Sequence, residues 1–486
     1  MPATVDFAVK LGKMFSAMKS SASAPRFRIA HFMLDPVSYT PHFAYRPTGR
    51  PDSHGQPLCC ESVPLEKIAA AVCTPAYVYS RASIESAYRR LDRAFRSLPH
   101  SICYAVKANS NLSVLRLLAH LGSSFDVVSG GELDRLSRVG VPGSRIVFSG
   151  VGKTREEIRA ALRYRSGTNS SRLRSRHAGI FLFNVESAAE LEVLASEAAS
   201  HIRAGGAPPA VAIRINPDIL AGGHRHISTG RREHKFGIEW TEARRLYLAH
   251  KNSRFFTWRG ISAHIGSQIL TVDPFRRTLA RLASCVRELA LAGIRLDCID
   301  VGGGFGIRYT NEKPFDAPAY ARTLARIIRP LARIIRPLGC RLLLEPGRSI
   351  VGPAGVLLTR VLYVKETRGK RFVIVDAAMN DLIRPVLYDA IQPITRTSRG
   401  PVARPKNRVD IVGPVCETGD FLARDWPLED VAPGELLAVW AAGAYCFVEA
   451  SNYNARPRPA EVLVNRAQFR VARRRESLDD LVRGEL

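Results

Sequence analysis

Lys107 closes the stretch SICYAVKAN, residues 101–109, which otherwise has the apolar pattern of a buried β-strand. Burying an ammonium is costly unless the group is paired or has lost its proton, so this lysine needs an explanation. In one interpretation the aliphatic stem lies along apolar surface and the ammonium reaches water at the strand end. In the other, burial keeps the amine reactive, and it can form a Schiff base with an aldehyde.

The chain also contains the residue types that an aldehyde cofactor would need. Pyridoxal phosphate, the common one, requires a phosphate-binding loop, a partner for its pyridine nitrogen and a surface for its ring. The run VGGGFG, 301–306, can bring backbone N–H groups to a phosphate. A glycine-rich turn that binds no ligand would have the same sequence pattern. Glu345 can keep the nitrogen protonated or simply pair with Arg348. His264 can stack on the ring or be a hydrogen-bonded core residue.

Eight short apolar runs alternate with helical patterns from about residue 100, which is typical of a parallel sheet covered by helices. Eight such units predict a (β/α)8 barrel of the TIM type, with its active site at the carboxyl ends of the strands. Each candidate residue named above stands at the end of one run. The runs are 101–109, 123–129, 145–150, 179–185, 209–216, 260–266, 298–304 and 341–347.

The chain outside this barrel has a different residue pattern, with little sign of helix. After "EPGR", β-branched runs with Pro and Gly turns predict an all-β domain over 348–486, and the segment 43–81 is expected to join it. The barrel is then predicted over 82–347, with an Arg-rich insert at 163–178 that reads as a surface loop. Residues 1–42 are expected to be a disordered extension or a mis-assigned start.

One heptapeptide, ARIIRPL, occurs twice in tandem, at 325–331 and 332–338. Seven residues make almost two helical turns, so the repeat keeps the apolar face nearly in register. Pro330 falls inside the lengthened helix and is expected to kink or end it. We expect this helix on the outside of the barrel, away from the chemistry.

The formal charge of +27 raises the question of a nucleic-acid partner. Ten of these charges come from residues 1–42, from the insert at 163–176 and from the repeat. The rest is dispersed, without the basic stripe interleaved with aromatic residues that single-strand binders use. We therefore expect no nucleic-acid partner.

Membrane and metal chemistry are also not expected. The longest nearly apolar run, 436–448, is too short to span a bilayer. The nine cysteines form no CxxC pair and no zinc-type spacing, which favours a reducing cytoplasm and no metal.

Several motifs together carry a resemblance to a known family. From about residue 43 to the C-terminus the chain resembles the diaminopimelate decarboxylases of the alanine racemase-like pyridoxal phosphate fold. Some motifs are shared with ornithine and arginine decarboxylases, but NDLIRPVLY, CETGD and SNYNARPRPAEVLV are characteristic of the diaminopimelate branch. The other motifs are YAVKAN, SGGEL, HISTG with HKFGI, HIGSQ, DVGGGFGI and LLLEPGRSIVGPAG.

The resemblance implies decarboxylation of meso-2,6-diaminopimelate to L-lysine and CO2, with Lys107 as the Schiff-base lysine and Cys416 as the proton donor. It also implies a homodimer in which Cys416 and Glu417 reach the active site of the neighbouring subunit. The implied cofactor-binding residues are Lys107, His264, Ser267, Gly302, Gly303, Gly304, Glu345, Gly347, Arg348 and Tyr445. The implied substrate-binding residues are Arg348, Arg384 and Tyr388 for the distal carboxylate, Glu417 for the distal ammonium, and Tyr445.

Four positions depart from the family pattern: His234, Ala378, Cys446 and Glu449. A glutamate at 449 either alters the charge preference for substrate or is solvated. The rival functions are an arginine or ornithine decarboxylase, which would not need arginines for a distal carboxylate, and a non-catalytic pyridoxal phosphate-binding protein, which would lack Cys416 or the substrate clamp. A racemase would use Tyr445 as a second acid and base opposite Lys107.

Overall fold

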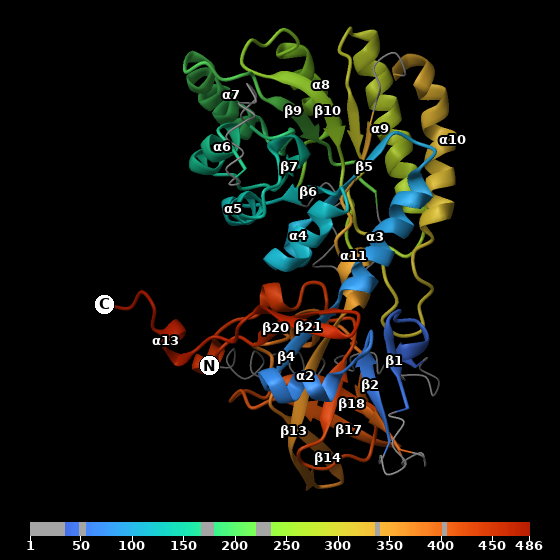
Figure 1. The fold of residues 1–486 in the computed structure, drawn as a ribbon. Helices are drawn as coiled ribbons and strands as arrows, with labels where there is room; N and C mark the ends of the chain where they lie inside the picture. The colour runs from blue at the N-terminus through green and yellow to red at the C-terminus, as the bar shows by residue number, and fades with distance from the viewer. Residues whose placement is uncertain (1–34, 48–54, 167–178, 220–234, 336–340, 401–405) are drawn as a thin grey trace, which may run out of the picture. The chain divides into compact units, whose positions relative to one another are not determined.

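Eight parallel strands close into a barrel, seen in the upper part of Figure 1. The computed structural model describes residues 35–47, 55–166, 179–219, 235–335, 341–400 and 406–486. Around the barrel the strand order is β10-β11-β12-β5-β6-β7-β8-β9, so strands that are consecutive in the chain lie side by side. The strands are β5 (His100–Ala105), β6 (Ser124–Val127), β7 (Ile146–Phe148), β8 (Leu182–Val185), β9 (Ala210–Arg214), β10 (Thr257–Ser262), β11 (Cys298–Asp300) and β12 (Arg341–Leu344).

This architecture confirms the predicted (β/α)8 barrel, since each of the eight apolar runs supplies one strand. Small and branched side chains fill the barrel interior, because eight strands leave room for side chains only. The interior cluster comprises Cys103, Val147, Leu182, Ala210, Ala212, Cys298 and Leu343.

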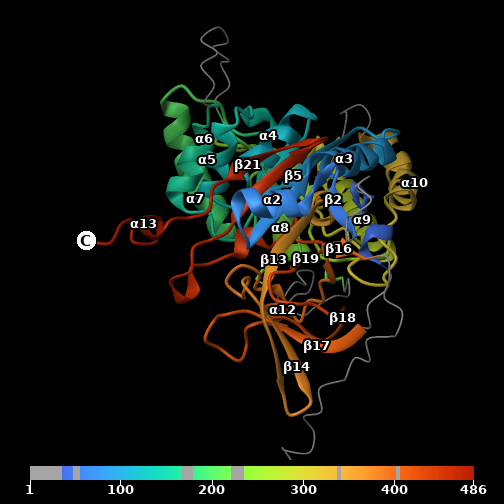
Figure 2. The ribbon, with the colours of Figure 1, turned by 60° about the horizontal axis from the view of Figure 1, so that its bottom comes forward.

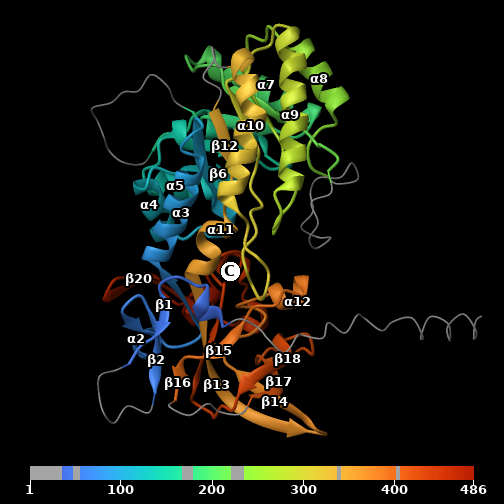
Figure 3. The same cartoon turned by 90° about the vertical axis from the view of Figure 1, so that its right-hand side faces the viewer.

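Helices cover the outside of the barrel, and Figure 3 shows α9 and α10 side by side there. All but α3, which precedes β5, follow a barrel strand. The helices are α3 (Arg81–Phe95), α4 (Leu112–His120), α5 (Gly130–Arg138), α6 (Arg155–Leu162), α7 (Ala188–Arg203), α8 (Trp240–Ala249), α9 (Asp273–Leu291) and α10 (Ala317–Ile335).

Capping residues start several of these helices. In each case a side-chain oxygen accepts a hydrogen bond from a backbone N–H of the first helical turn. The caps are Ser80, Asn111, Ser129, Thr154 and Ser187. Each cap therefore sets the point at which the chain leaves its preceding turn and begins a helix.

The tandem repeat behaves differently from expectation. The prediction was that Pro330 would kink or end the helix; helix α10 runs from Ala317 to Ile335, so the helix does not end at Pro330. A proline removes one backbone hydrogen bond, a cost that tertiary packing can offset, and α10 packs against α9 and α3. The second copy of the repeat extends beyond the described residues.

Two further sheets make up the rest of the described chain. One contains β1 (Phe43–Tyr45), β2 (Gln56–Cys60), β3 (Val63–Pro64) and β16 (Ser398–Arg399). The other contains β4 (Ala76–Ser80), β13 (Gly355–Thr367), β14 (Lys370–Val375), β15 (Ile394–Arg396), β17 (Lys406–Val412), β18 (Phe421–Glu429), β19 (Leu436–Val439), β20 (Ala460–Asn465) and β21 (Gln468–Arg473). Figure 2 shows the long β13–β14 hairpin of this sheet.

Strand β4, from the part of the chain before the barrel, lies between β13 and β20, which follow the barrel. The larger sheet therefore contains strands from both sides of the barrel sequence. Phe43 packs edge-on against Trp440 in the core beneath it. Short helices complete this region: α2 (Leu65–Val72), α11 (Arg348–Val351), α12 (Arg384–Tyr388) and α13 (Leu478–Leu481). The 3-10 turns are η1 (Pro36–Ser38), η2 (Val106–Ala108), η3 (Gly143–Arg145), η6 (Gly352–Ala354), η7 (Phe447–Glu449) and η8 (Tyr453–Ala455).

Two hydrogen bonds attach the loop after β19 to the turn that carries Lys107. The backbone N–H of Tyr445 donates to the carbonyl oxygen of Ala108 at 2.8 Å. The side chain of Asn109 donates to the carbonyl oxygen of Gly443 at 3.1 Å. The barrel and the β-rich region therefore meet at the carboxyl end of β5. Within the described part of the chain, no helix is both long and apolar enough to cross a bilayer.

Candidate active site

Lys107 lies in the 3-10 turn η2, directly after β5, and its side chain is 35% exposed. Its Nζ lies 2.6 Å from Oδ2 of Asp126, whose side chain is fully buried at the end of β6. Burial alone would lower the pKa of Lys107, but the carboxylate of Asp126, helped by Tyr445 and Glu345, raises it above its usual value. The amine is therefore an ion-paired ammonium here, which differs from the expectation that burial alone would keep it reactive.

Asp126 belongs to a group of three buried carboxylates with Asp300 and Glu345. Asp300 accepts hydrogen bonds from the backbone N–H of Gly302 at 2.9 Å and from the side chain of Asn184 at 2.9 Å. Burial raises the pKa of Asp300, and burial with the nearby charges of Asp126 and Asp300 raises the pKa of Glu345 well above its usual range. These surroundings therefore favour the protonated form of Glu345, whereas a nearby cation such as Lys107 favours the carboxylate.

His264 stands at the same edge, after β10. Its Nδ1 accepts a hydrogen bond from the backbone N–H of Gly303 at 3.1 Å. Burial, with the positive charges of Arg214 and Lys107, lowers the pKa of His264 well below its usual value. A neutral imidazole with an unprotonated Nδ1 therefore faces the cavity, and the contact of 4.0 Å to Glu345 is not an ion pair.

The glycine run lies where three loops converge. A Cβ on Gly303 would clash with the carbonyl oxygen of Glu345, and a Cβ on Gly304 would clash with that of Gly266. Gly304 also has a φ of +91°, which side chains with a Cβ rarely adopt. The run therefore brings bare backbone to the cavity wall.

Two arginines line the other side of the cavity. Arg348 donates to the hydroxyl of Tyr309 at 2.5 Å and to Oγ of Ser267 at 3.0 Å, and its guanidinium lies 4.7 Å from the ring centre of Tyr445. Arg384 lies 5.4 Å from the ring centre of Tyr388. Both arginines are buried, and among the described residues no carboxylate forms an ion pair with either. This arrangement suits a carboxylate from a ligand.

A cavity of about 220 Å³ connects these groups. Gly302 and Gly303 lie beside it rather than in its wall. The lining residues are Ala105, Lys107, His264, Ser267, Gly304, Phe305, Glu345, Gly347, Arg348, Arg384, Tyr388, Tyr445 and Glu449. The sequence-predicted candidates from the barrel and from 384–445 thus come together at one place.

Cys416 and Glu417 are the exceptions. Both are exposed, and neither lines the cavity of its own chain. The backbone N–H of Cys416 donates to the side chain of Asn454 at 3.0 Å, and the hydroxyl of Tyr453 donates to Glu417 at 3.0 Å. Cys416 and Glu417 are therefore surface residues of the single chain.

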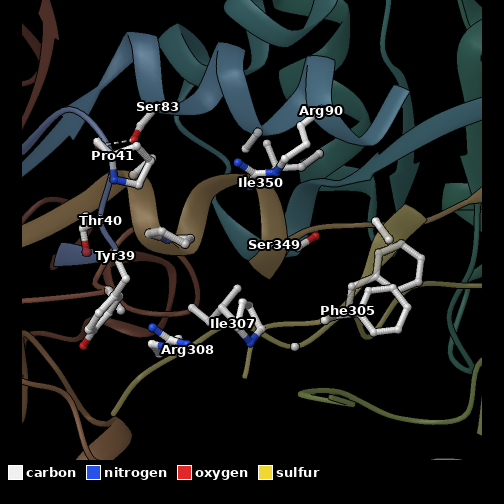
Figure 4. A pocket seen from close by; sticks show the side chains of 18 of the residues that line it. Tyr39, Thr40, Pro41, Ser83, Arg90, Phe305, Ile307, Arg308, Ser349 and Ile350 are labelled. Carbon is white, nitrogen blue, oxygen red and sulfur yellow. Dashed lines mark hydrogen bonds between the residues drawn. The ribbon is translucent and has the colours of Figure 1, made fainter. Parts of the chain in front are cut away.

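A second and larger cavity, of about 520 Å³, is lined in part by the chain segment that follows the glycine run (Figure 4). Ser83 and Arg90 of α3, Arg308 and Ile350 contribute to its wall, and Phe305 lines both cavities. Its described wall contains no lysine, histidine or cysteine. It therefore lacks a group that could bind an aldehyde, and the smaller cavity is the site of interest.

The smaller cavity fits pyridoxal phosphate. Burial and the charges of Asp126 and Asp300 raise the pKa of Glu345, so a protonated pyridine nitrogen beside Glu345 would supply a stabilising positive charge. One oxygen of Asp126 is buried with no hydrogen-bond partner in the described structure. Gly304 and Gly347 leave the wall bare for a phosphate. The donor set and the charge deficit both match the cofactor.

Sequence reasoning missed several residues of this site, above all Asp126, Asp300 and Asn184. A usable signal existed, since SSFDVVS and CIDVGGG place an acid inside an apolar strand just as SICYAVKAN places a lysine. The pairing of Lys107 with Asp126 could not be read this way, because it depends on the register of two neighbouring strands. His234, one of the departures from the family pattern, lies outside the described residues.

Comparisons with known proteins agree with this site. The family described as "Pyridoxal-dependent decarboxylase, pyridoxal binding domain" matches residues 81–352. The diaminopimelate decarboxylase of Pseudomonas aeruginosa is 47% identical over 428 residues, covering 88% of this chain and 96% of that protein. The crystal structure of the Helicobacter pylori diaminopimelate decarboxylase complexed with L-lysine is 39% identical, with a TM-score of 0.77 over 86% of this chain and 98% of that one. The corresponding M. jannaschii structure in co-complex with L-lysine is 32% identical, with a TM-score of 0.80 over 92% and 98%. This chain belongs to the pyridoxal-dependent decarboxylases, within the diaminopimelate decarboxylase family.

Proposed function

We propose that this protein decarboxylates meso-2,6-diaminopimelate to L-lysine and CO2, with pyridoxal phosphate as its cofactor. The observation that carries the proposal is the single cavity that holds Lys107 together with Arg348 and Arg384. A substrate with a carboxylate at its far end would pair with these guanidinium groups. Ornithine and arginine end in cationic groups, which the same arginines would repel.

Pyridoxal phosphate, when bound, supplies a protonated ring that takes up the electron pair left behind as the substrate's α-carboxylate departs as CO2. We infer that the amine of Lys107 would hold the cofactor at its aldehyde group. Glu345 would accept a hydrogen bond from the pyridine nitrogen and keep it protonated. His264, being neutral, would stack on the ring without adding a competing positive charge. Gly302, Gly303, Gly304, Gly347 and Ser267 would hold the phosphate.

At the other end of the substrate, we infer that Arg348, Arg384 and Tyr388 bind the distal carboxylate. Tyr445 lies on Arg348 and would touch both cofactor and substrate. Loss of CO2 leaves an electron pair on the α-carbon, and a proton must reach that carbon to give L-lysine. The thiol of Cys416 is the proposed donor, and it would regain its proton from solvent.

This assignment of Cys416 requires a second subunit, because the residue lies outside the cavity of its own chain. We therefore propose a homodimer in which each CETGD segment, 416–420, reaches the cavity of the other subunit. There Glu417 would accept a hydrogen bond from the substrate's distal ammonium. We also propose a cytoplasmic location, supported by the eight described cysteines, all of which are free thiols.

The test of the activity is CO2 release by the purified protein with pyridoxal phosphate. We expect release from meso-diaminopimelate and none from L-lysine, L-ornithine or L-arginine, and we expect Lys107→Ala to abolish it. No release from meso-diaminopimelate, with a cofactor absorbance band still present, would show that the substrate assignment is wrong.

A further inference from the structure

Glu449 is an acidic residue in the active-site cavity that the proposed mechanism does not use. It ends the 3-10 turn η7 and lines the cavity together with Arg348, Arg384 and Tyr388. The residue is half-buried, and its Oε2, which is buried, has no hydrogen-bond donor among the described residues. Leaving a buried carboxylate oxygen unpaired is costly, so the position calls for a donor that the described chain does not supply.

The surroundings of Glu449 show that it is not simply the partner of an arginine. No ion pair joins it to Arg384 or Arg348, although their positive charges oppose the effect of burial, which raises the pKa of Glu449. The carboxylate also acts on Tyr388, whose pKa burial and Glu449 raise. The far end of the cavity therefore presents cationic and anionic groups side by side, each with unused hydrogen-bonding capacity.

This pattern matches the chemistry of an amino-acid end group, in which a carboxylate and an ammonium are attached to the same carbon. A ligand with only a distal carboxylate would meet the two arginines but would also meet the charge of Glu449. A ligand with only a distal ammonium would meet Glu449 but would also meet the arginines. Only a zwitterionic end satisfies both, and each mismatched ligand is rejected by a like charge.

We propose that Glu449 is a specificity-determining residue that accepts a hydrogen bond from the distal ammonium of the substrate. Glu449 and Lys107 of one cavity belong to the same chain. The proposal rests on the proposed function and adds a second acceptor to Glu417 of the other subunit. It assigns the substrate class as diamino acids with an intact amino-acid group at the end remote from the reacting carbon.

Three ligands distinguish the contribution of the distal carboxylate from that of the distal ammonium. L-lysine carries both the distal carboxylate and the distal ammonium, 6-aminohexanoate carries only the carboxylate, and cadaverine carries only the ammonium. Their inhibition constants against CO2 release from meso-diaminopimelate, and their binding to the holoenzyme by calorimetry, are measured for the wild type and Glu449→Gln. Glu366→Gln is the matched control, since Glu366 has a side chain that is 75% exposed and lies on the β13 hairpin.

We expect Glu449→Gln to weaken the binding of L-lysine about 10-fold or more. The KM for meso-diaminopimelate should rise by a similar factor, and kcat should change far less. Binding of 6-aminohexanoate should stay the same or become tighter, because the like charge is gone. Cadaverine should lose affinity as L-lysine does. Glu366→Gln should leave all three unchanged.

If Glu449→Gln changed the affinities for L-lysine and 6-aminohexanoate equally, the proposal would be overturned, because Glu449 would then not bind the distal ammonium. An unchanged L-lysine affinity would also overturn it. Failure of the proposed function looks different, since the wild type itself would then release no CO2 from meso-diaminopimelate. The calorimetric comparison of the three ligands still decides the role of Glu449 in that case.

Discussion

The Nζ of Lys107 lies 2.6 Å from the Oδ2 of Asp126, and the pairing of two barrel strands places them there. In the register of β5 and β6, Ala105 lies opposite Asp126, so the turn that follows β5 brings Lys107 over the carboxylate. The lysine is thereby anchored at the wall of the cavity before any ligand arrives.

This pair should make a measurable contribution to stability. In the cofactor-free protein we expect Lys107→Met to lower the free energy of unfolding by about 2–3 kcal/mol, because it leaves Asp126 buried without its partner. The double variant with Asp126→Asn should cost less than the sum of the two single changes by about 1 kcal/mol or more. Urea unfolding of the four proteins measures this coupling, and strict additivity would contradict it.

His264 should make the protein less stable in acid. Its pKa in the folded state is well below that of an unfolded histidine, about 6.5, so the unfolded chain binds more protons as pH falls. Stability from a neutral His264 is present above that value and is lost below it.

We therefore expect the Tm of the wild type to fall more than the Tm of His264→Gln when the pH is lowered from about 7.5 to 5.5. The exposed His120→Gln serves as the control. A difference that does not vary with pH would contradict the neutral imidazole. Cofactor-free protein is used, so that loss of cofactor binding does not enter the comparison.

Glu345→Gln should stabilise the cofactor-free protein and weaken the enzyme. Burial and the charges of Asp126 and Asp300 raise the pKa of Glu345, so the folded chain holds its proton more tightly than the unfolded chain and loses stability above the unfolded-state pKa, which a glutamine would restore. The same change removes the carboxylate that keeps the pyridine nitrogen protonated. We expect kcat to fall about 100-fold or more. Thermal unfolding and CO2 release test the two effects, and a parallel loss of both would show a merely structural role.

The shared active site can be tested by mixing subunits. Lys107→Ala and Cys416→Ala should each be inactive as homodimers, but a mixed dimer would contain one cavity with both native residues. Random exchange should restore about one quarter of the wild-type activity. If Cys416 acts only within its own chain, no mixture of the two variants regains activity.

The barrel and most of its chemistry were readable from the sequence. Apolar runs alternating with helical patterns predict parallel strands, and the geometry of such strands puts their carboxyl ends at one edge. Lys107, His264, Glu345 and Arg348 each follow a run, so their convergence needed no knowledge of the packing. The family motifs then added the residues from the β-rich region.

Other features depend on which atoms become neighbours, and no local pattern carries that information. The register of β5 with β6 turned Lys107 into an ion-paired ammonium. Helix α10 continues past Pro330. The turn η7 placed Glu449 inside the cavity, whereas the sequence had left open whether it was solvated.

By itself, the sequence determined the fold class, the edge of the barrel where chemistry occurs and the family, because periodicity and motifs are properties of consecutive residues. Only the tertiary structure decided the raised pKa values of Asp300 and Glu345 and the exposure of Cys416. These depend on burial and on charges contributed by distant parts of the chain, which exist only once the strands and loops have packed together.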